Sequence, residues 1–557
     1  MVNPTPYYLH GYFKKHYPEQ AKHVKWKPSI LVKKSTQDVV AFLNKHQADV
    51  LCVSLYIWNV SQSMDMLALV KEQYAKPLKI VVGGPSCDAV KDEWETQYSF
   101  VDHFVVGQGE KAWANLALDF LGVQVLDADS PNIVHFLRKG ETAPVKKYEY
   151  EFVRGIHYSP YMECEDLIHD LQAEYHDGDL TWPYETQRGC PYHCSFCDWN
   201  GGQSNKTQKR KEVNFVDEID FFAKNKMYKL YISDANFGMW DVDVEIMKRL
   251  VQHKSEGHNF KFITVNMNKI VNQNFKEIMH MIVQHDFSTW VKLSVQDIQP
   301  NVLKAIDRPG DWNEVKQAGL ELYQAFSKSK NLNKIFVELI LGLPEQTVES
   351  FTATLNEIHG SGFLTRTYPF LLLRNAPANY DLEYRAKYGI RDALVYEMLD
   401  TVANGSNIKE IAERPLANLI YNQIVECNSF TEKDLVKMTM IDQLYRKLFL
   451  AAWPAYGFID VNWPHLEAVA ALLIKSDDFE YVLDCRYENF KKYRIDALDS
   501  ANGKVLIHGD DLVAIIGRNL DAVHKNLVST GTKQETIIQL FDHWGKFVSM
   551  NSHLDRP

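Results

Sequence analysis

Short apolar runs alternate with amphipathic segments along the first third of the chain. Residues 48–54, 78–82 and 101–106 are dominated by apolar side chains, which predicts buried strands. Residues 64–74 place apolar side chains at helical spacing, and a second amphipathic segment begins at Lys111. Buried strands that alternate with helices are typical of parallel sheets covered on both faces. This region is therefore predicted to be an α/β, Rossmann-like doubly wound sheet.

The same alternation continues through the middle of the chain from Tyr184. Six apolar segments predict strands, and helical segments separate them: 185–187, 229–233, 261–265, 291–295, 335–339 and 367–373. Barrels built from such βα units form their active sites at the carboxyl ends of the strands. The polar residues at those strand ends are therefore the candidates for a functional site.

The last third of the chain has helical periodicity from about Tyr384. Its clearest segments are 431–453, 465–474 and 532–550. A chain of 557 residues is too long for one core. We predict three domains: a Rossmann-like domain over 1–150, a βα domain over 151–385 and a mainly helical domain over 386–557, which we expect to serve the substrate.

The composition excludes several classes of protein. A net charge of −11 and a pI near 6.0 disfavour binding to nucleic acid through neutralised phosphates. No uninterrupted apolar run of about 18 residues predicts a membrane span, and the first residues do not resemble a signal peptide. Eight cysteines are too few for a disulfide scaffold of this length. We expect a cytoplasmic protein without membrane or nucleic-acid partners.

Three cysteines stand close together at Cys190, Cys194 and Cys197, in the spacing CxxxCxxC. Three thiolates can hold three irons of a 4Fe–4S cluster and leave the fourth iron open to a small molecule, whereas clusters that only carry electrons usually have four cysteines. Two alternatives stay open from the residues alone. His193 could complete a zinc site, although zinc ligands usually come as two separated pairs, or the thiols could be unrelated.

With Phe196 before the last cysteine and Gly342-Leu-Pro-Glu-Gln-Thr347 downstream, the chain resembles the radical SAM superfamily. The resemblance implies a central partial (β/α)6 TIM-type barrel and a 4Fe–4S cluster held by the three cysteines. It also implies S-adenosylmethionine (SAM) as substrate and radical source. The site residues that it implies for SAM are Ser233, Asp234, Asn236, Asn266, Ser294, Gln296, Arg308 and Leu343. Arg308 suits the methionine carboxylate because a guanidinium binds a carboxylate through two hydrogen bonds.

The turns of the first domain carry a second resemblance, to the cobalamin-binding domain that precedes many radical SAM barrels. The residues that it implies for cobalamin are Trp58, Gly83, Gly84, Pro85, Gly107, Gly109 and Glu110. Glycines at the carboxyl ends of parallel strands let a ligand approach the backbone closely. The DxHxxG motif that supplies an axial histidine to cobalt in mutases is absent, so we expect no histidine below the cobalt.

These resemblances imply a cobalamin-dependent radical SAM enzyme, most of all a C-methyltransferase that acts through a 5′-deoxyadenosyl radical and methylcobalamin. Expected partners are a small-molecule or peptide substrate and an external one-electron reductant of the flavodoxin or ferredoxin type. The sequence assigns no general acid or base. Three alternatives remain: a cobalamin-dependent rearrangement or cyclisation, a non-enzymatic iron–sulfur sensor, and a methylthiotransferase without cobalamin in which Cys52 and Cys87 serve a second cluster.

Overall fold

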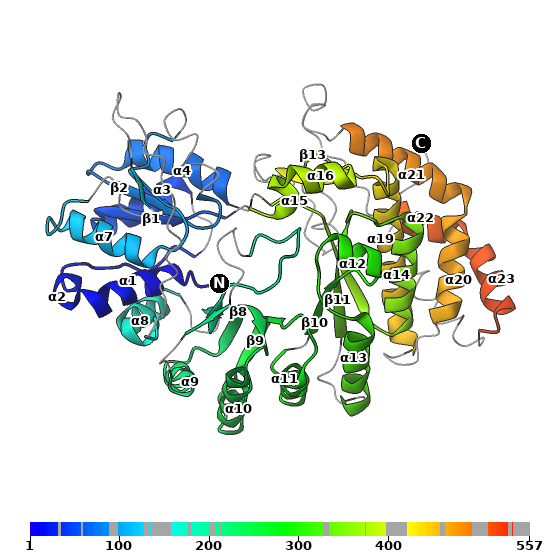
Figure 1. The fold of residues 1–557 in the computed structure, drawn as a ribbon, viewed down its shortest axis with the longest axis horizontal. Coiled ribbons are helices and arrows are strands. Elements are labelled where there is room, and N and C mark those ends of the chain that lie inside the picture. The colour runs from blue at the N-terminus through cyan, green and yellow to red at the C-terminus, as the bar shows by residue number, and fades with distance from the viewer. Residues whose placement is uncertain are drawn as a thin grey trace. The chain divides into compact units, whose positions relative to one another are not determined.

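The structure is a computed structural model, and its elements are drawn in Figure 1. It describes the chain outside residues 32–34, 57–58, 88–97, 127–132, 136–157, 176–179, 200–206, 211–213, 289, 327–333, 374, 397–419, 457–462, 493–510, 533–536 and 538–557. The chain divides into two compact units. The first unit comprises Met1–Pro191 and Gln203–Asn266, and the second comprises Tyr192–Gly202 and Met267–Pro557.

The first unit begins with a four-stranded sheet in the order β1-β2-β3-β4. β1 and β2 pair in parallel, as do β2 and β3, while β4 pairs antiparallel with β3 at the edge. The elements of this region are α1 (Thr5–His16), α2 (Pro18–Ala21), α3 (Thr36–His46), β1 (Val50–Ser54), α4 (Val60–Gln73), β2 (Lys79–Gly83), β3 (His103–Val105), α7 (Glu110–Phe120) and β4 (Ile133–His135). The parallel strands confirm the predicted sheet, and the antiparallel edge was not predicted.

Helices cover both faces of this sheet, as Figure 1 shows around β1 and β2. Ile80, Val82 and Phe104 pack in one apolar core with side chains of α3 and α4. Val81 and Val105 point to the opposite face and pack with side chains of α7. Successive residues of a strand alternate between faces, so an apolar run of this kind is buried on both sides.

The rest of the first unit contains three strands in the order β5-β8-β9 and the hairpin β6-β7. Its elements are a 3-10 turn (Met162–Cys164), α8 (Glu165–Glu174), β5 (Trp182–Tyr184), β6 (Gln187–Arg188), β7 (Gln208–Lys209), α9 (Phe215–Lys224), β8 (Lys229–Phe237), α10 (Asp241–Ser255) and β9 (Lys261–Met267). Two strand predictions need correction. The first strand is 182–184 rather than 185–187, and β8 runs to Phe237 rather than Ser233, so that Asp234 and Asn236 belong to the strand.

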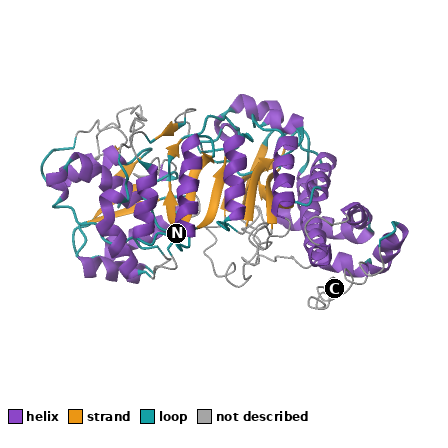
Figure 2. Cartoon of the chain, turned by 90° about the horizontal axis from the view of Figure 1, so that it is seen from below, coloured by secondary structure: helices purple, strands orange, loops and turns teal. Residues whose placement is uncertain are grey.

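The second unit contains a parallel sheet in the order β10-β11-β12. Helices lie beside its strands, as Figure 2 shows in purple and orange. Its elements are α11 (Gln273–Gln284), β10 (Trp290–Gln296), α12 (Pro300–Ala305), α13 (Trp312–Phe326), β11 (Lys334–Leu341), α14 (Val348–Gly360), β12 (Leu364–Pro369), α15 (Pro377–Tyr380) and α16 (Leu382–Tyr388). Together with β5, β8 and β9, these strands account for all six predicted βα segments.

The C-terminal region is mainly helical, as predicted. Its elements are β13 (Arg391–Tyr396), β14 (Ile420–Glu426), α19 (Glu432–Tyr456), α20 (Trp463–Ile474), α21 (Asp477–Lys492), α22 (Asp511–Arg518) and α23 (Leu520–Ser529). The antiparallel pair β13-β14 was missed by the helical pattern. The helix predicted over 532–550 lies almost wholly outside the described residues. Within the described parts of the chain, no helix combines the length and apolar character that crossing a bilayer requires.

Candidate functional site

In the first unit, the side chain of Asn236 lies against the first cysteine of the motif. Its Nδ2 is 3.2 Å from Sγ of Cys190, and Asn236 is completely buried. The carbonyl of Asn236 accepts a hydrogen bond of 2.9 Å from Nε2 of Gln187. Asn236 was predicted to bind SAM. Its Nδ2 donates to the sulfur of a predicted cluster ligand, which is the contact expected of a residue that orients and tunes that ligand. Its Oδ1 is buried without a hydrogen-bond partner among the described residues, and its assignment to SAM stays a prediction.

Asp234 lies two residues earlier on β8 and organises the segment that leads to the cysteines. Oδ1 accepts backbone N–H groups from Thr186 at 2.8 Å and Gln187 at 3.1 Å, and Oδ2 accepts the Thr186 hydroxyl at 2.5 Å. Burial raises the pKa of Asp234 to about 7, although these hydrogen bonds oppose the shift. Both oxygens are thus used within the protein, so this geometry makes Asp234 a positioning residue.

Arg188, two residues before Cys190, is held by two carboxylates. Its Nη1 lies 2.7 Å from Glu110, and its Nε lies 2.8 Å from Glu185. The guanidinium also lies over the ring of Tyr8, 5.0 Å from the centroid. Burial alone would lower the pKa of Arg188, but Glu110 and Glu185 raise it well above its ordinary value. Glu110 was predicted to face cobalamin; in the structure it is buried and anchors this arginine.

In the second unit, the other two cysteines also have N–H donors at their sulfur atoms. Nη1 of Arg308 lies 3.8 Å from Sγ of Cys194, and the backbone N–H of Trp199 lies 3.4 Å from Sγ of Cys197. Arg308 also donates to the carbonyl of Ser294. Its Nε is buried and makes no hydrogen bond with any described residue. That donor is available to a carboxylate, which agrees with the predicted role of Arg308.

The loop between these two cysteines is fixed at Ser195. The backbone N–H of Ser195 donates to the carbonyl of Ile306 at 2.9 Å, and its carbonyl accepts from Ala378 at 2.9 Å. Its hydroxyl lies 2.8 Å from the hydroxyl of Tyr384, which donates to the carbonyl of Ala305 at 3.1 Å. Several segments of the second unit therefore hold the loop at Ser195 in place.

Ser294 and Gln296 lie at the carboxyl end of β10, where the strand is irregular. The register with β11 shifts between these two residues, and Gln296 has a φ of 75°, in the left-handed region. Bulges and strained residues of this kind are frequent next to active sites. The Ser294 hydroxyl donates to Glu338 at 2.6 Å, and Nζ of Lys292 lies 3.7 Å from the same carboxylate. These contacts gather polar side chains near the end of β10, and the assignment of Ser294 and Gln296 to SAM stays a prediction.

The turn that contains Leu343 is built by Gln346. Oε1 of Gln346 accepts the N–H groups of Gly342 at 2.9 Å and Leu343 at 3.2 Å, and its Nε2 donates to Asp297 at 2.6 Å. The carbonyl of Leu343 accepts the N–H of Gln346. Leu343 was predicted to contact adenine through its backbone. Both of its polar backbone groups are used inside the turn, so in this structure Leu343 shapes the turn.

The two remaining SAM candidates lie in the first unit. The hydroxyl of Ser233 donates to the carbonyl of Tyr184 at 3.1 Å, which links β8 to β5. Asn266 is partly buried on β9. Their assignment to SAM stays a prediction.

The predicted cobalamin turns lie at the carboxyl ends of β2 and β3. Gly84 has a φ of 100°, and a Cβ there would lie 2.6 Å from the carbonyl oxygen of Leu55. Gly84 is therefore required by the fold itself, and Gly84→Leu would test folding rather than cobalamin binding. At Gly83 a Cβ would meet only Val105, at an ordinary 3.5 Å. Gly83 is the better position at which to test a ligand.

The other cobalamin candidates are less constrained by packing. Pro85 and Gly107 are exposed at the same edge of the sheet, and Gly107 has a φ of 80°. Gly109 is the N-cap of α7, where a Cβ would lie 3.0 Å from Leu9. Trp58 lies outside the described residues. An exposed backbone at the carboxyl ends of parallel strands is where ligands of such sheets bind, so the edge fits a bound corrinoid.

Cys52 and Cys87, the thiols considered for a second cluster, belong to opposite faces of the first sheet. Cys52 packs with side chains of α7, and burial raises the pKa of its thiol to about 12. Cys87 packs in the core on the α3 and α4 side. Two thiols separated by a sheet do not bind one cluster, which disfavours the methylthiotransferase alternative.

Three residues that the site depends on were missed by sequence reasoning. Arg188 lies two residues before Cys190, and Glu338 lies four residues before Gly342. Their proximity to the two motifs was the signal that could have placed them in the site. Tyr384 carries no local signal, because its contact with Ser195 joins residues that are 189 positions apart.

The donor set fits a 4Fe–4S cluster. Each of the three predicted ligands has an N–H group directed at its sulfur, from Asn236, from Arg308 and from the backbone of Trp199. Hydrogen bonds of this kind stabilise a negatively charged thiolate ligand. His193 is exposed, so its side chain is not buried with the motif as a fourth ligand of a closed zinc site would be.

Two family models match the chain, in the predicted order. The B12 binding domain matches residues 24–117, and the Radical SAM superfamily matches residues 184–358. The chain thus contains a radical SAM domain, preceded by a B12-binding domain. Both resemblances inferred from the motifs are thereby confirmed.

Two curated relatives are similar over a shared stretch. The cobalamin-dependent radical SAM methyltransferase TokK of Streptomyces tokunonensis is 32% identical over 352 residues, which cover 62% of this chain and 50% of TokK. The 2-(S-pantetheinyl)-carbapenam-3-carboxylate methyltransferase of Streptantibioticus cattleyicolor is 32% identical over 354 residues, with the same coverage of 62% and 50%. The chain thus spans about half the length of the curated relatives it matches.

One solved structure resembles most of the chain. The radical S-adenosylmethionine methyltransferase TsrM from Kitasatospora setae has a TM-score of 0.52 and 13% sequence identity, and the match covers 84% of this chain and 93% of TsrM. At this identity the likeness shows the fold, and it agrees with the predicted α/β fold with a helical C-terminal region.

Proposed function

We propose that the chain is a cobalamin-dependent radical SAM methyltransferase that methylates a carbon atom of a small organic substrate. The observation that carries the proposal is a B12-binding domain followed by a radical SAM domain whose three motif cysteines all have N–H donors at sulfur. The names of the two curated relatives, both methyltransferases, favour methyl transfer over rearrangement.

Cys190, Cys194 and Cys197 are the residues that would hold the cluster. When bound, the cluster and SAM would supply the radical chemistry, and cobalamin would supply the methyl group. Asn236 orients Cys190 through its amide, and Ser195 fixes the loop between the other two cysteines. The protein therefore contributes geometry and electrostatics before the cofactors bind.

Arg308 would bind the methionine carboxylate of SAM. Its Nη2 is already held by the carbonyl of Ser294, which fixes the plane of the guanidinium, while its buried Nε has no described partner. An unpaired buried donor is unfavourable, so a carboxylate that accepts from Nε gains affinity at this position. Glu338 accepts a hydrogen bond from the hydroxyl of Ser294 and so orients Ser294 at the same strand end.

The first sheet would hold cobalamin at the edge formed by Gly83, Pro85 and Gly107, of which Pro85 and Gly107 are exposed. We also propose a flavodoxin- or ferredoxin-type reductant and a cytoplasmic location, because reduction of the cluster needs an external electron and a reducing compartment. The mainly helical domain over 386–557 is proposed to serve the substrate, and the boundaries 1–150, 151–385 and 386–557 remain our domain proposal.

The test needs no knowledge of the substrate. The chain is purified anaerobically, reconstituted with iron, sulfide and hydroxocobalamin, and incubated with a strong reductant and SAM that carries a deuterated methyl group. A methyltransferase forms S-adenosylhomocysteine and transfers the label to the corrinoid, and it also releases 5′-deoxyadenosine slowly.

Each outcome decides between functions. Release of 5′-deoxyadenosine without S-adenosylhomocysteine would overturn methyl transfer in favour of rearrangement. Absence of any SAM cleavage by protein that holds a full cluster would overturn the enzyme proposal and leave a sensor. A control variant in which all three motif cysteines are alanine should form neither 5′-deoxyadenosine nor a cluster.

A further inference from the structure

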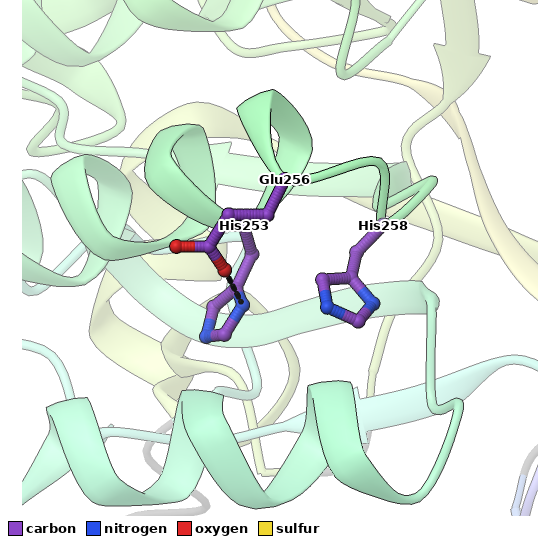
Figure 3. Close-up of side chains that lie close together, drawn as sticks. All are labelled: His253, Glu256 and His258. Atoms are coloured by element: carbon purple, nitrogen blue, oxygen red, sulfur yellow. Dashed lines mark ion pairs between the residues drawn. The ribbon is translucent and has the colours of Figure 1, made fainter.

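Two histidines and a glutamate converge at the end of α10, apart from the residues described so far. His253 lies in the last turn of the helix, Glu256 follows it, and His258 lies in the loop that leads to β9. One ligand atom from each side chain lies within 4.8 Å of the other two. Figure 3 shows the three side chains and the close pair between Glu256 and His253.

Neighbouring elements hold both imidazole rings in place. Nε2 of His253 lies 2.7 Å from Oδ1 of Asp220 on α9, and Arg249 pairs with the same carboxylate at 2.5 Å. The hydroxyl of Tyr228, just before β8, lies 3.1 Å from Nδ1 of His258. Histidines that bind metals characteristically use one ring nitrogen for the ion and give the other to a carboxylate or another polar group. Both rings have that second partner here.

The nitrogen of His253 that faces Glu256 lacks a hydrogen bond among the described residues. His253 is 6% exposed, and its Nδ1 is buried without a hydrogen bond to any described residue. The carboxylate of Glu256 lies 3.2 Å from this atom but is not aligned as an acceptor. A buried nitrogen in this state is unfavourable, and an ion between Nδ1 and the carboxylate would satisfy both.

We propose that His253, Glu256 and His258 bind one divalent zinc-type cation. Nδ1 of His253, a carboxylate oxygen of Glu256 and Nε2 of His258 are the ligands, and water takes the fourth position. Two imidazoles and a carboxylate are a ligand set that zinc prefers. Glu256 is exposed, which leaves the ion an entry path.

This site is separate from the candidate active site of the same unit. Tyr228 and His258 lie at the amino ends of β8 and β9, whereas Asn236 lies near the carboxyl end of β8. Eight residues of strand separate Tyr228 from Asn236, which corresponds to roughly 25 Å. The zinc site is therefore independent of the cluster, of SAM and of the proposed methyl transfer.

The decisive measurement is metal content. Full-length protein with its cluster is dialysed against micromolar Zn²⁺ and then against metal-free buffer, and zinc and iron per chain are counted. We expect about one zinc in addition to about four irons. His258→Ala should lose the zinc and keep the iron, whereas a control substitution of the exposed His23, His23→Ala, should keep both.

A second measurement identifies the ligands. Co²⁺ added to the variant that lacks all three motif cysteines should give visible d–d absorption without thiolate-to-cobalt charge transfer. Asp220→Asn should weaken the affinity for Co²⁺ by about 10- to 100-fold, because Asp220 orients His253. Zinc retained in full by His258→Ala, zinc lost only with the cysteines, or no zinc in the wild-type protein would each overturn the proposal.

Discussion

The two compact units of this protein treat their predicted cluster ligands differently. In the first unit, Cys190 receives a hydrogen bond from the neutral and completely buried amide of Asn236. In the second unit, Cys194 lies next to the cationic guanidinium of Arg308. A neutral donor tunes a sulfur without adding charge, whereas a cation also attracts an anionic ligand. Under the proposed function, Asn236 would orient the first cysteine, and Arg308 would bind the methionine carboxylate of SAM.

Each unit uses a buried aspartate to hold a backbone segment in place. Asp234 in the first unit and Asp297 in the second are both completely buried, and each accepts two backbone N–H groups. Burial raises the pKa of both carboxyl groups. Both also accept a threonine hydroxyl, from Thr186 for Asp234 and from Thr354 at 3.5 Å for Asp297. The difference is the Gln346 amide, which donates to Asp297.

The largest effect is expected from the cysteines themselves. Cys190→Ala and Cys194→Ala, one in each unit, should each reduce iron from about four per chain to nearly none, because an open-iron cluster has no ligand to spare. Iron, sulfide and the visible absorbance of the cluster measure this. The exposed Cys485 provides a control, and Cys485→Ala should keep the full cluster. A full cluster in either motif variant would disprove the ligand set.

The next largest effect should come from Arg308. Arg308→Gln should weaken SAM binding by about 10- to 100-fold, which corresponds to a charged hydrogen bond of roughly 1.5–3 kcal/mol, while the iron content stays unchanged. Equilibrium binding of SAM to the anaerobic protein measures the change. Arg366→Gln, on the exposed side of β12, should bind SAM normally. Equal SAM affinities of the Arg308→Gln and Arg366→Gln variants would contradict the proposed role of Arg308.

The buried aspartates should respond unequally to the same substitution. Asp297→Asn would place an amide N–H against Nε2 of Gln346. That residue is unable to turn over, because its Oε1 already accepts from Gly342 and Leu343. We expect a loss of about 1–3 kcal/mol and a lower apparent melting temperature. Asp234→Asn should be milder, since the Thr186 hydroxyl can reverse and accept.

The pH dependence of stability tests whether the buried carboxyl group of Asp234 holds a proton in the folded protein. Its pKa of about 7 in the folded protein exceeds the ordinary value of 3.8. The folded state therefore holds the proton to higher pH, and this group makes the protein less stable as the pH rises from about 4 to 7. Asp234→Asn should remove that decline in melting temperatures measured across the range. An unchanged decline would mean that other groups cause it.

The smallest effect is expected from Asn236. Asn236→Ala removes one N–H···S hydrogen bond and should lower the reduction potential of the cluster by several tens of mV, since such bonds stabilise the reduced form. A potentiometric titration followed by electron paramagnetic resonance measures it. Ser233→Ala on the same strand is the control, because its hydroxyl bonds to Tyr184. Equal potentials would show that the amide only fills space.

Local patterns were sufficient to predict the strand–helix alternation, the three-cysteine loop and the family. They did not show which polar groups are already used by hydrogen bonds inside the protein. The carboxylate of Asp234 accepts from Thr186, which lies 48 positions away. The backbone N–H of Leu343 donates to Gln346 in the same turn. The zinc-type site escaped notice because Asp220 and Tyr228 reach it from different elements. The pair β13-β14 was missed although its strands of six and seven residues are longer than β1 and β2.

The ion pair between Glu110 and Arg188 has a consequence for dissecting this protein. A cut near residue 150 would release the B12-binding domain but separate Glu110 from the guanidinium of Arg188, and the carbonyl of Tyr8 from the hydroxyl of Tyr158. The isolated piece would be expected to aggregate or to rearrange at that surface. Grafting it onto another barrel would require an arginine just ahead of the recipient's first cysteine. The sequence motifs define two separate domains, whereas this ion pair joins the B12-binding domain to the segment just before Cys190.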